Sequence, residues 1–277
     1  MSRPTVARIH LDNLRHNFRL ARELATPART IAVVKADGYG HGIGRVARAL
    51  SAQTDLYAVA CLEEAIALRE AGLAQPVLLL QGVHEARDLR ICEAENFIVV
   101  VHDPQQLAWL EAGQVRPEVW LKVNTGMNRL GFAPGDVEKA RDLLARAGVT
   151  ITGVMTHFAC ADDEHGETTA RQTEVFDRAT AGLGAITRSV ANSAAHFRSG
   201  QALFDRTRPG IMLYGGSPML GCHGPALGLR AVMTLESRLI ATRELAPGDA
   251  VGYGETWRAC RPTRMGMVGI GYGDGYP

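Results

Sequence analysis

Short apolar runs alternate with amphipathic stretches along most of this chain, and this alternation constrains the fold more than any other feature of the sequence. The runs lack polar alternation, which is typical of strands buried on both faces in a parallel sheet. Eight such runs occur, at residues 30–35, 56–60, 77–80, 97–101, 119–123, 151–155, 189–192 and 210–214. Helices are expected from Asp12 to near Pro27 and near residues 43–52, 62–72, 84–95, 103–112, 135–147, 166–182 and 194–200.

Strict alternation of strands and helices predicts an α/β fold with a parallel sheet and right-handed crossovers. Eight units over about 200 residues favour a closed (β/α)8 TIM-type barrel over an open doubly wound sheet. An open sheet stays as the alternative, because periodicity does not report closure. No G-x-G-x-x-G follows any of the strands, which argues against a dinucleotide site.

The pattern changes near residue 225, where helical spacing stops. Residues 229–242 alternate like a strand, Pro247-Gly248 is a turn signal, and residues 265–272 read as another strand. We therefore expect the barrel over residues 11–225 and the start of an all-β second domain over residues 226–277. The chain stops directly after a predicted strand, so we expect this second domain to be incomplete.

Composition narrows the possible partners. A hydrophobic fraction of 46% is typical of a globular protein. The formal net charge of +1 is too small to attract nucleic acid or an anionic membrane through overall charge. No apolar run approaches the roughly 20 residues of a membrane span. The N-terminus lacks the apolar core of a signal peptide, which favours a cytoplasmic location. The five cysteines form no CxxC pair, so neither a disulfide framework nor a metal site is predicted.

Unusual polar residues coincide with the expected strand ends, where an α/β barrel builds its active site. Each alone has an ordinary explanation: a solvated lysine, a core histidine, a capping serine or a surface arginine. Their convergence at one end of one barrel is harder to explain structurally. They are Lys35 and Tyr39 after the first strand, Lys122 and Arg129 at the fifth, His157 after the sixth, Asn192 and Ser193 at the seventh, and Arg208 before the eighth.

The chemistry of this set points to one cofactor. A lysine that is removed from water loses its proton readily and forms Schiff bases with aldehydes, which suits Lys35. Neutral donors suited to a phosphate are Tyr39, Ser193 and the backbone N–H groups of Gly210 and Ile211. A cofactor that carries both an aldehyde and a phosphate is pyridoxal 5′-phosphate (PLP), whose pyridine nitrogen Arg208 could then face.

Seven segments together resemble the bacterial alanine racemases, PLP-dependent enzymes of fold-type III. They occur in family order from residue 32 to the end of the chain, which is far more specific than one motif. They are AVVKADGYGHG (32–42), KVNTGMNRLG (122–131), THFA (156–159), ANSA (191–194), RPGIMLYG (208–215), GYG (252–254) and GIGYGDGY (269–276). The resemblance also implies that an N-terminal strand within residues 1–10 associates with the β domain.

The resemblance implies interconversion of L-alanine and D-alanine by two bases. Lys35 would hold PLP and act on one face of the substrate α-carbon, and Tyr253 from the other subunit of a homodimer would act on the opposite face. His157 would connect Arg208 to Tyr253 through hydrogen bonds. The product would be D-alanine for cell-wall peptidoglycan, or the reaction would serve alanine catabolism.

The remaining roles also come from the resemblance. Arg129 would reach the cofactor and the substrate carboxylate, Lys122 is a candidate for carbamylation, and Tyr272 would line the path of the substrate. The cofactor-binding set would be Lys35, Tyr39, His157, Asn192, Ser193, Arg208, Gly210 and Ile211. Alternatives are a racemase for serine or a broader range of amino acids, or a non-catalytic PLP-binding barrel, against which the Gly-Tyr-Gly setting of Tyr253 argues.

Overall fold

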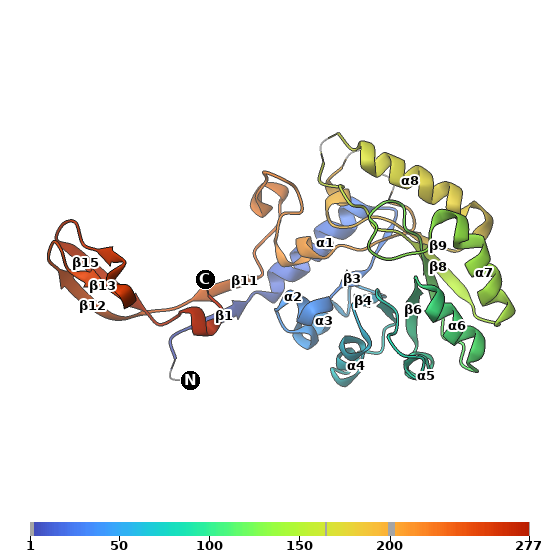
Figure 1. Ribbon diagram of the computed structural model, residues 1–277, viewed down its shortest axis with the longest axis horizontal. Coiled ribbons are helices and arrows are strands. Elements are labelled where there is room, and N and C mark those ends of the chain that lie inside the picture. The colour runs from blue at the N-terminus through green and yellow to red at the C-terminus, as the bar shows by residue number, and fades with distance from the viewer. Residues whose placement is uncertain (1–2, 164, 199–202, 277) are drawn as a thin grey trace. The chain divides into compact units, whose positions relative to one another are not determined.

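The computed structural model describes residues 3–163, 165–198 and 203–276 (Figure 1). Contacts divide the chain into two compact units. The barrel unit spans Leu11–Val232, and the β unit combines Met1–His10 with Met233–Pro277. Among the described residues, none of the helices is both long and apolar enough to cross a membrane.

The barrel unit is built on a seven-stranded parallel sheet in the order β3 to β9, which confirms the predicted α/β class. Six of the eight predicted runs form its strands with boundaries within a few residues, and the run at 30–35 supplies β3. The strands are β3 (Ala32–Val33), β4 (Tyr57–Val59), β5 (Val77–Leu79), β6 (Phe97–Val101), β7 (Val119–Lys122), β8 (Ile151–Met155) and β9 (Thr187–Ser189). β4 to β7 are fully buried, as their apolar composition requires.

A short eighth strand completes the curled sheet. β10 (Arg206–Thr207) pairs in parallel with β2 (Arg29–Thr30), which leads directly into β3. Backbone hydrogen bonds continue on both sides of β10, from Arg208 N–H to the Ala191 carbonyl at 2.9 Å and from Ile31 N–H to the Thr207 carbonyl at 2.9 Å. Strand hydrogen bonding therefore extends from β9 through β10 to β2.

The predicted eighth strand at residues 210–214 is wrong. Ile211–Tyr214 forms a 3₁₀ turn whose side chains at Met212, Leu213 and Tyr214 are buried. This segment is apolar because its side chains pack inward from a turn. The Leu213 carbonyl accepts a hydrogen bond at 3.1 Å from Asn17 of the first helix, α1 (Leu11–Ala25). The true strand is two residues long and polar, so it gave no hydrophobic signal.

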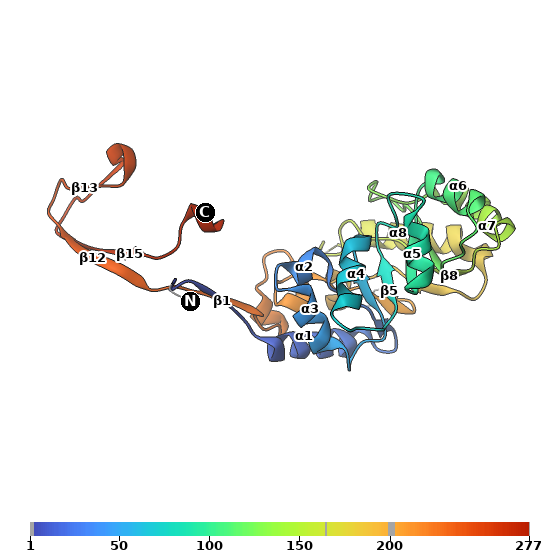
Figure 2. The ribbon, with the colours of Figure 1, turned by 90° about the horizontal axis from the view of Figure 1, so that it is seen from below.

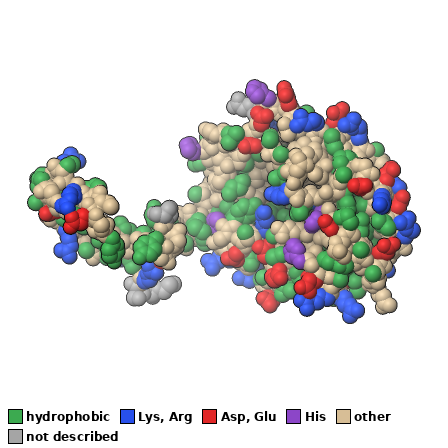
Figure 3. All heavy atoms as spheres, viewed as in Figure 1, with side chains coloured by type: hydrophobic (Ala, Val, Ile, Leu, Met, Phe, Trp, Pro, Cys, Tyr) green, Lys and Arg blue, Asp and Glu red, His purple; other side chains and the backbone are tan. Residues whose placement is uncertain are grey.

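Helices cover the outside of the curled sheet (Figures 1 and 2). The expected helices form, except that residues 194–200 contain only a 3₁₀ turn at Ala194–Phe197 and their last two positions lie outside the described residues. These helices are α1 (Leu11–Ala25), α3 (Ile43–Leu50), α4 (Leu62–Glu70), α5 (Asp88–Ala94), α6 (Pro104–Ala112), α7 (Val137–Arg146) and α8 (Glu167–Thr180). The short segment α2 (Lys35–Tyr39) follows β3 and is not a regular helix, because its backbone is left-handed. On the face drawn in Figure 3, acidic and basic side chains are interspersed over this unit.

Alternate residues of the strands fill the barrel interior. This cluster comprises Ile31, Val33, Leu56, Ala58, Leu78, Ile98, Val100, Trp120 and Met155. Gly153 on β8 leaves room for the largest of them, because a Cβ there would lie 2.4 Å from the Trp120 ring. The core thus supports the strand ends from below.

The β unit consists of antiparallel pairs. β1 (Val6–Ile9) pairs with β11 (Met233–Glu236), β12 (Leu239–Leu245) with β15 (Thr263–Val268), and β13 (Ala250–Val251) with β14 (Trp257–Arg258). The predicted strand at 265–272 is shorter than expected, because Tyr272–Asp274 forms a 3₁₀ turn. The N-terminal segment is held to this unit by the ion pairs of Arg3 with Asp274 and of Arg8 with Glu236.

Candidate active site

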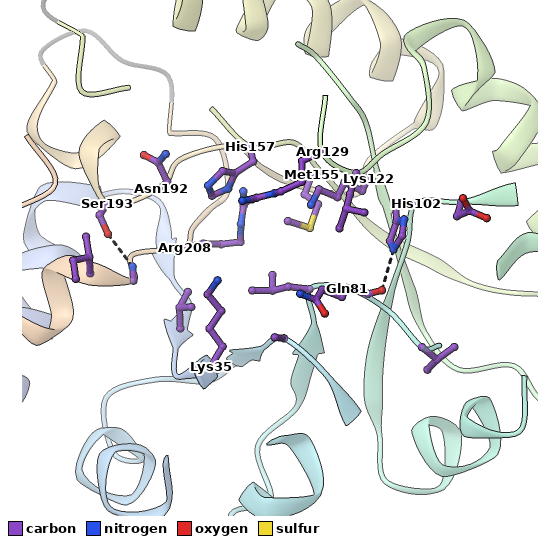
Figure 4. Close-up of a pocket in the computed structure, with 18 of the residues that line it drawn as sticks. Lys35, Gln81, His102, Lys122, Arg129, Met155, His157, Asn192, Ser193 and Arg208 are labelled. Carbon is purple, nitrogen blue, oxygen red and sulfur yellow. Dashed lines mark hydrogen bonds between the residues drawn. The ribbon is translucent and has the colours of Figure 1, made fainter. Parts of the chain in front are cut away.

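A cavity of about 900 Å³ opens at the carboxyl ends of the barrel strands. Ten of the twelve residues singled out in the sequence line it, from five separate strand ends. They are Lys35, Tyr39, Lys122, Arg129, His157, Asn192, Ser193, Arg208, Gly210 and Ile211. Figure 4 shows the Lys35 side chain reaching into the cavity from one wall while Arg208, His157, Arg129 and Lys122 lie along the opposite wall.

Lys35 stands at the start of a left-handed turn. Ala36, Asp37, Gly38 and Tyr39 have φ values of 52°, 52°, 62° and 53°. Hydrogen bonds from Gly38 to Val34 and from Gly40 to Ala36, each 2.9 Å, close the turn with helical spacing. Because left-handed backbone costs about 1–2 kcal/mol for each non-glycine residue, three such residues among four consecutive positions require support from the surrounding structure. Lys35 and Tyr39, at the two ends of this turn, both line the cavity.

Tyr39 contributes a hydroxyl beside Gly210. Its ring stacks on Tyr214 with centroids 4.7 Å apart, and a Cβ on Gly210 would lie 2.3 Å from the Tyr39 Oη. Only glycine therefore lets the phenol approach this backbone. Partial burial raises the pKa of Tyr39, so the phenol stays protonated and able to donate.

Ser193 also contacts Gly210. Its Oγ accepts a hydrogen bond from the Gly210 N–H at 2.9 Å, shown dashed in Figure 4. Asn192 is engaged differently, because its side-chain oxygen accepts from the N–H groups of Ala194 and Ala195 at 3.2 and 3.3 Å. A serine hydroxyl, a tyrosine hydroxyl and a glycine N–H are thus gathered at one end of the cavity. Asn192 orders the turn that presents the serine.

Arg208 is a buried cation at the cavity wall, with 4% of its surface exposed. Its guanidinium donates to the Ser189 Oγ and to the Thr156 carbonyl, which fix its orientation. Burial lowers the pKa of Arg208 to about 9, so it keeps its proton at neutral pH. The side chain is a rigid positive donor that does not exchange protons near pH 7.

Lys122 is the second buried cation, with 6% exposure. Burial, then the nearby charges of Arg208, Arg129 and Lys35, lower the pKa of Lys122 to about 8. The half-buried His157 has its pKa lowered by the same influences, desolvation first, and is therefore neutral at pH 7. This wall repels further cations and attracts anionic ligands.

Sequence reasoning missed several cavity residues. The additional polar and aromatic ones are Gln81, His84, His102, Asp103, Gln105, Gln106, Trp109 and Asp162. The His102 Nε2 lies 2.9 Å from the Gln81 carbonyl oxygen (Figure 4). Gln81 and His102 follow β5 and β6 closely, so applying the strand-end criterion to every strand would have found them.

The two remaining predicted residues belong to the β unit. Tyr253 is 98% exposed and Tyr272 is 92% exposed. Tyr253 begins a 3₁₀ turn at Tyr253–Glu255, and Tyr272 begins another at Tyr272–Asp274. Neither phenol is fixed by packing within its own unit.

The donor set fits a PLP-like ligand. The cavity volume lies in the range of small-ligand sites and exceeds what such a ligand needs. An amine at Lys35, neutral donors around Gly210 and a buried guanidinium at Arg208 match an aldehyde, a phosphate and a ring nitrogen in turn. The described residues contain no cluster of acidic, histidine or cysteine side chains that could hold a metal ion.

The fold and cavity define an α/β-barrel protein with a lysine-centred, cation-lined site and an attached β unit. The model of the alanine racemase N-terminal domain matches residues 9–218, and that of the alanine racemase C-terminal domain matches residues 232–277. The chain therefore belongs to the alanine racemase family.

Individual relatives agree with this assignment. An alanine racemase from Marinobacter nauticus is 57% identical over 100% of this chain and 78% of its own length. A catabolic alanine racemase from Pseudomonas putida is 47% identical over 99% and 77%. The crystal structure of the biosynthetic alanine racemase from Pseudomonas aeruginosa superposes with a TM-score of 0.91 at 41% identity, covering 99% of this chain and 77% of that one.

Proposed function

We propose that this chain interconverts L-alanine and D-alanine with PLP held at Lys35. The observation that carries the proposal is the convergence of an amine, phosphate donors and a buried guanidinium in one cavity of an alanine racemase family member. PLP, when bound, supplies an electron sink for the negative charge that forms at the substrate α-carbon. Everything else depends on how the residues of the chain bind, orient and exchange protons.

Binding is divided between two ends of the cavity. Tyr39, Ser193 and the N–H groups of Gly210 and Ile211 hold the phosphate. Arg208 donates a hydrogen bond to the ring nitrogen and keeps its own proton, because its pKa stays near 9. By keeping its proton, Arg208 would leave the ring nitrogen unprotonated and so favour rapid return of the proton to the α-carbon.

Two residues act as the bases on opposite faces of the α-carbon. The Lys35 Nζ removes or returns the α-proton on one face, and the Tyr253 Oη does so on the other. A single base tends to return the proton to the side from which it came. We propose that Tyr253 serves the cavity of the partner subunit in a cytoplasmic homodimer.

The surrounding residues tune these steps. His157, neutral because its pKa is lowered, relays a hydrogen bond between Arg208 and Tyr253. Arg129 pairs with the substrate carboxylate, Asn192 orders the phosphate-binding turn, and Tyr272 lines the path of the substrate.

We also propose that Lys122 is carbamylated. Its pKa of about 8 leaves part of the amine neutral near pH 7, and only the neutral amine attacks CO₂. The resulting carbamate would place one negative charge among the cations of the wall and orient Arg129. Growth in ¹³C-labelled bicarbonate followed by ¹³C NMR detects such a carbamate, and the signal should disappear in Lys122→Ala.

A chiral assay tests the reaction. Purified protein loaded with PLP should convert either pure alanine enantiomer to a racemic mixture, whereas serine should react much more slowly. Faster turnover of serine would favour the broader-specificity alternative. PLP binding without turnover of either amino acid would favour a non-catalytic barrel.

Tyr253→Phe tests the arrangement of the two bases. In ²H₂O, the substitution should slow exchange of the α-proton from one alanine enantiomer far more than from the other. Tyr276→Phe, which also removes a phenol from the β unit, is the control. Equal losses for both enantiomers would contradict the assignment of Tyr253 to one face.

A further inference from the structure

The support for the left-handed turn comes from a helix outside the barrel. Glu64 on α4 accepts a hydrogen bond from the Ala36 N–H at 2.5 Å with one carboxylate oxygen and from the Ala60 N–H at 2.7 Å with the other. Ala36 directly follows Lys35, and Ala60 directly follows β4 and lines the cavity. One side chain therefore ties together the carboxyl ends of two neighbouring strands.

This contact satisfies a donor that the turn leaves free. The first N–H groups of any helical turn have no partner inside it. The Ala36 N–H is in this position, because the internal hydrogen bonds of the turn begin at Gly38. Without Glu64, a left-handed turn at this place would carry two costs: the unfavourable φ values and an unpaired Ala36 N–H group next to Lys35.

The same construction occurs at the next pair of strands. Gln106 is the third residue of α6, as Glu64 is the third residue of α4. The Gln106 side chain accepts from the His102 N–H, four residues earlier, at 2.9 Å, just as Glu64 accepts from Ala60. Its amide nitrogen donates to the carbonyls of Gln81 and Val83 at 3.3 and 3.2 Å.

The polarity of the partners explains which residue stands at each position. Glu64 faces two N–H donors, and a carboxylate offers two acceptors. Gln106 faces one donor and two carbonyl acceptors, which matches the mixed character of an amide. The reversed polarity at α4 arises because the left-handed turn presents an N–H group where the loop after β5 presents carbonyls.

We propose that Glu64 is a positioning residue that fixes the left-handed turn carrying Lys35 and Tyr39, and that it thereby sets the affinity of the cavity for an aldehyde–phosphate cofactor. The cofactor part rests on the proposed function. The hydrogen-bonding part does not, since it concerns only the chain itself. Two substitutions separate the geometry of the clamp from the charge of Glu64.

Glu64→Gln keeps the length of the side chain but replaces one acceptor by a donor that opposes an N–H group. Glu64→Asp keeps the charge but shortens the side chain, so it cannot reach both Ala36 and Ala60. Amide hydrogen exchange, measured without PLP, should accelerate about tenfold at Ala36, at Ala60 or at both in each variant, because each loses at least one of the two contacts. If exchange at both amides is unchanged, the clamp does not exist in solution.

The second measurement uses the protein loaded with PLP. The dissociation constant for PLP should rise about tenfold in both variants, corresponding to about 1.4 kcal/mol. The pH dependence of the absorption band of lysine-bound PLP should shift as well, which loss of fold stability alone would not produce. Glu63→Gln is the matched control: it removes the neighbouring carboxylate of α4, which is exposed and does not line the cavity, and it should leave exchange at Ala36 and Ala60 and that pH dependence unchanged.

The outcomes are distinct. Faster exchange with unchanged PLP affinity and band would make Glu64 merely structural and overturn the proposal. A PLP defect in Glu64→Gln but not in Glu64→Asp would show that charge, not the clamp, is responsible, and would overturn it too. Wild-type protein that binds no PLP at Lys35 would refute the proposed function, while the exchange data would still decide whether Glu64 holds the turn.

Discussion

The barrel unit and the β unit differ in how far they bury the side chains that are predicted to act in the active site. Arg208 and Lys122 are 4% and 6% exposed and are surrounded by strand ends. Tyr253 and Tyr272 are 98% and 92% exposed on short turns. The cations of the barrel are therefore held in place before a ligand binds. These two tyrosine side chains of the β unit, in contrast, are not packed against other described residues of that unit. This contrast suits a site completed by a second subunit.

The strands show the same difference. Leu78 on β5 is fully buried in the barrel interior, while Leu239 on β12 is 60% exposed. Burial of apolar surface, the main source of stability, is thus concentrated in the barrel. The same type of substitution, made once in the barrel unit and once in the β unit, measures how much more the buried side chains of the barrel contribute to stability.

The largest effect is expected at Lys35. Lys35→Ala should abolish covalent attachment of PLP, because it removes the amine that forms the Schiff base with the cofactor aldehyde. The chain has two other lysines, Lys122 and Lys139. Borohydride reduction followed by peptide mapping locates the attachment. Lys139→Ala, on the outer helix α7, is the control and should label normally. Label that persists in Lys35→Ala would remove the basis of the active-site assignment.

The next effect concerns the core. Leu78→Ala should lower the free energy of unfolding by about 3 kcal/mol, since it leaves a cavity inside the barrel. Leu239→Ala should lower it by less than about 1 kcal/mol, because most of that side chain already contacts solvent. Urea unfolding measures both. Equal losses would show that β12 is covered by other surfaces in solution.

A smaller effect is expected at Lys122. Its folded-state pKa of about 8 lies below its ordinary value of 10.5, so the unfolded chain binds more protons between these values. Stability should therefore rise as the pH increases from about 8 to 10. In buffer free of CO₂, Lys122→Met should raise the free energy of unfolding at pH 7 by about 2 kcal/mol and remove this rise. Lys139→Met should retain the wild-type pH profile, and a rise that persists in Lys122→Met would assign it to another group.

The smallest effect compares two phenols. The Tyr57 Oη donates to the Ala47 carbonyl at 2.7 Å in a fully buried position. Tyr57→Phe should cost about 1 kcal/mol by leaving that carbonyl unpaired. Tyr253→Phe should change the free energy of unfolding by less than about 0.5 kcal/mol. A large stability loss in Tyr253→Phe would mean that this phenol is packed in solution.

The sequence predicted the barrel well where hydrophobic pattern and burial coincide. β6 and β8 were predicted to the residue, β6 because all five of its positions are apolar and buried, and β8 because apolar residues stand at both of its ends. β10 was misplaced, because a two-residue strand held by backbone hydrogen bonds needs no apolar run. The neighbouring apolar run at 211–214 is buried for a different reason, as an inward-facing turn.

The candidate site was predictable in part because strand ends in a parallel barrel must meet at one rim, so Lys35 and His157 could be grouped from their positions alone. Arg208 precedes the strand predicted at 210–214, and only the observed β10, which ends at Thr207, brings it to this rim. Glu64 could not be found in this way. Its role depends on the left-handed turn after Lys35, and φ values of that kind at Ala36, Asp37 and Tyr39 have no signature in residue type.

The sequence by itself determined the order of strands and helices, the residues that reach the barrel rim and the family to which the chain belongs. These follow from the local periodicity of side chains and from motifs that are read in one dimension. Only the tertiary structure decided where the eighth strand lies and that the charged side chains of Lys122 and Arg208 are buried near each other. It also decided that a carboxylate on α4 accepts hydrogen bonds from the turn after Lys35. Hydrogen bonding and desolvation between distant segments set these features, and neither can be read until the chain has folded.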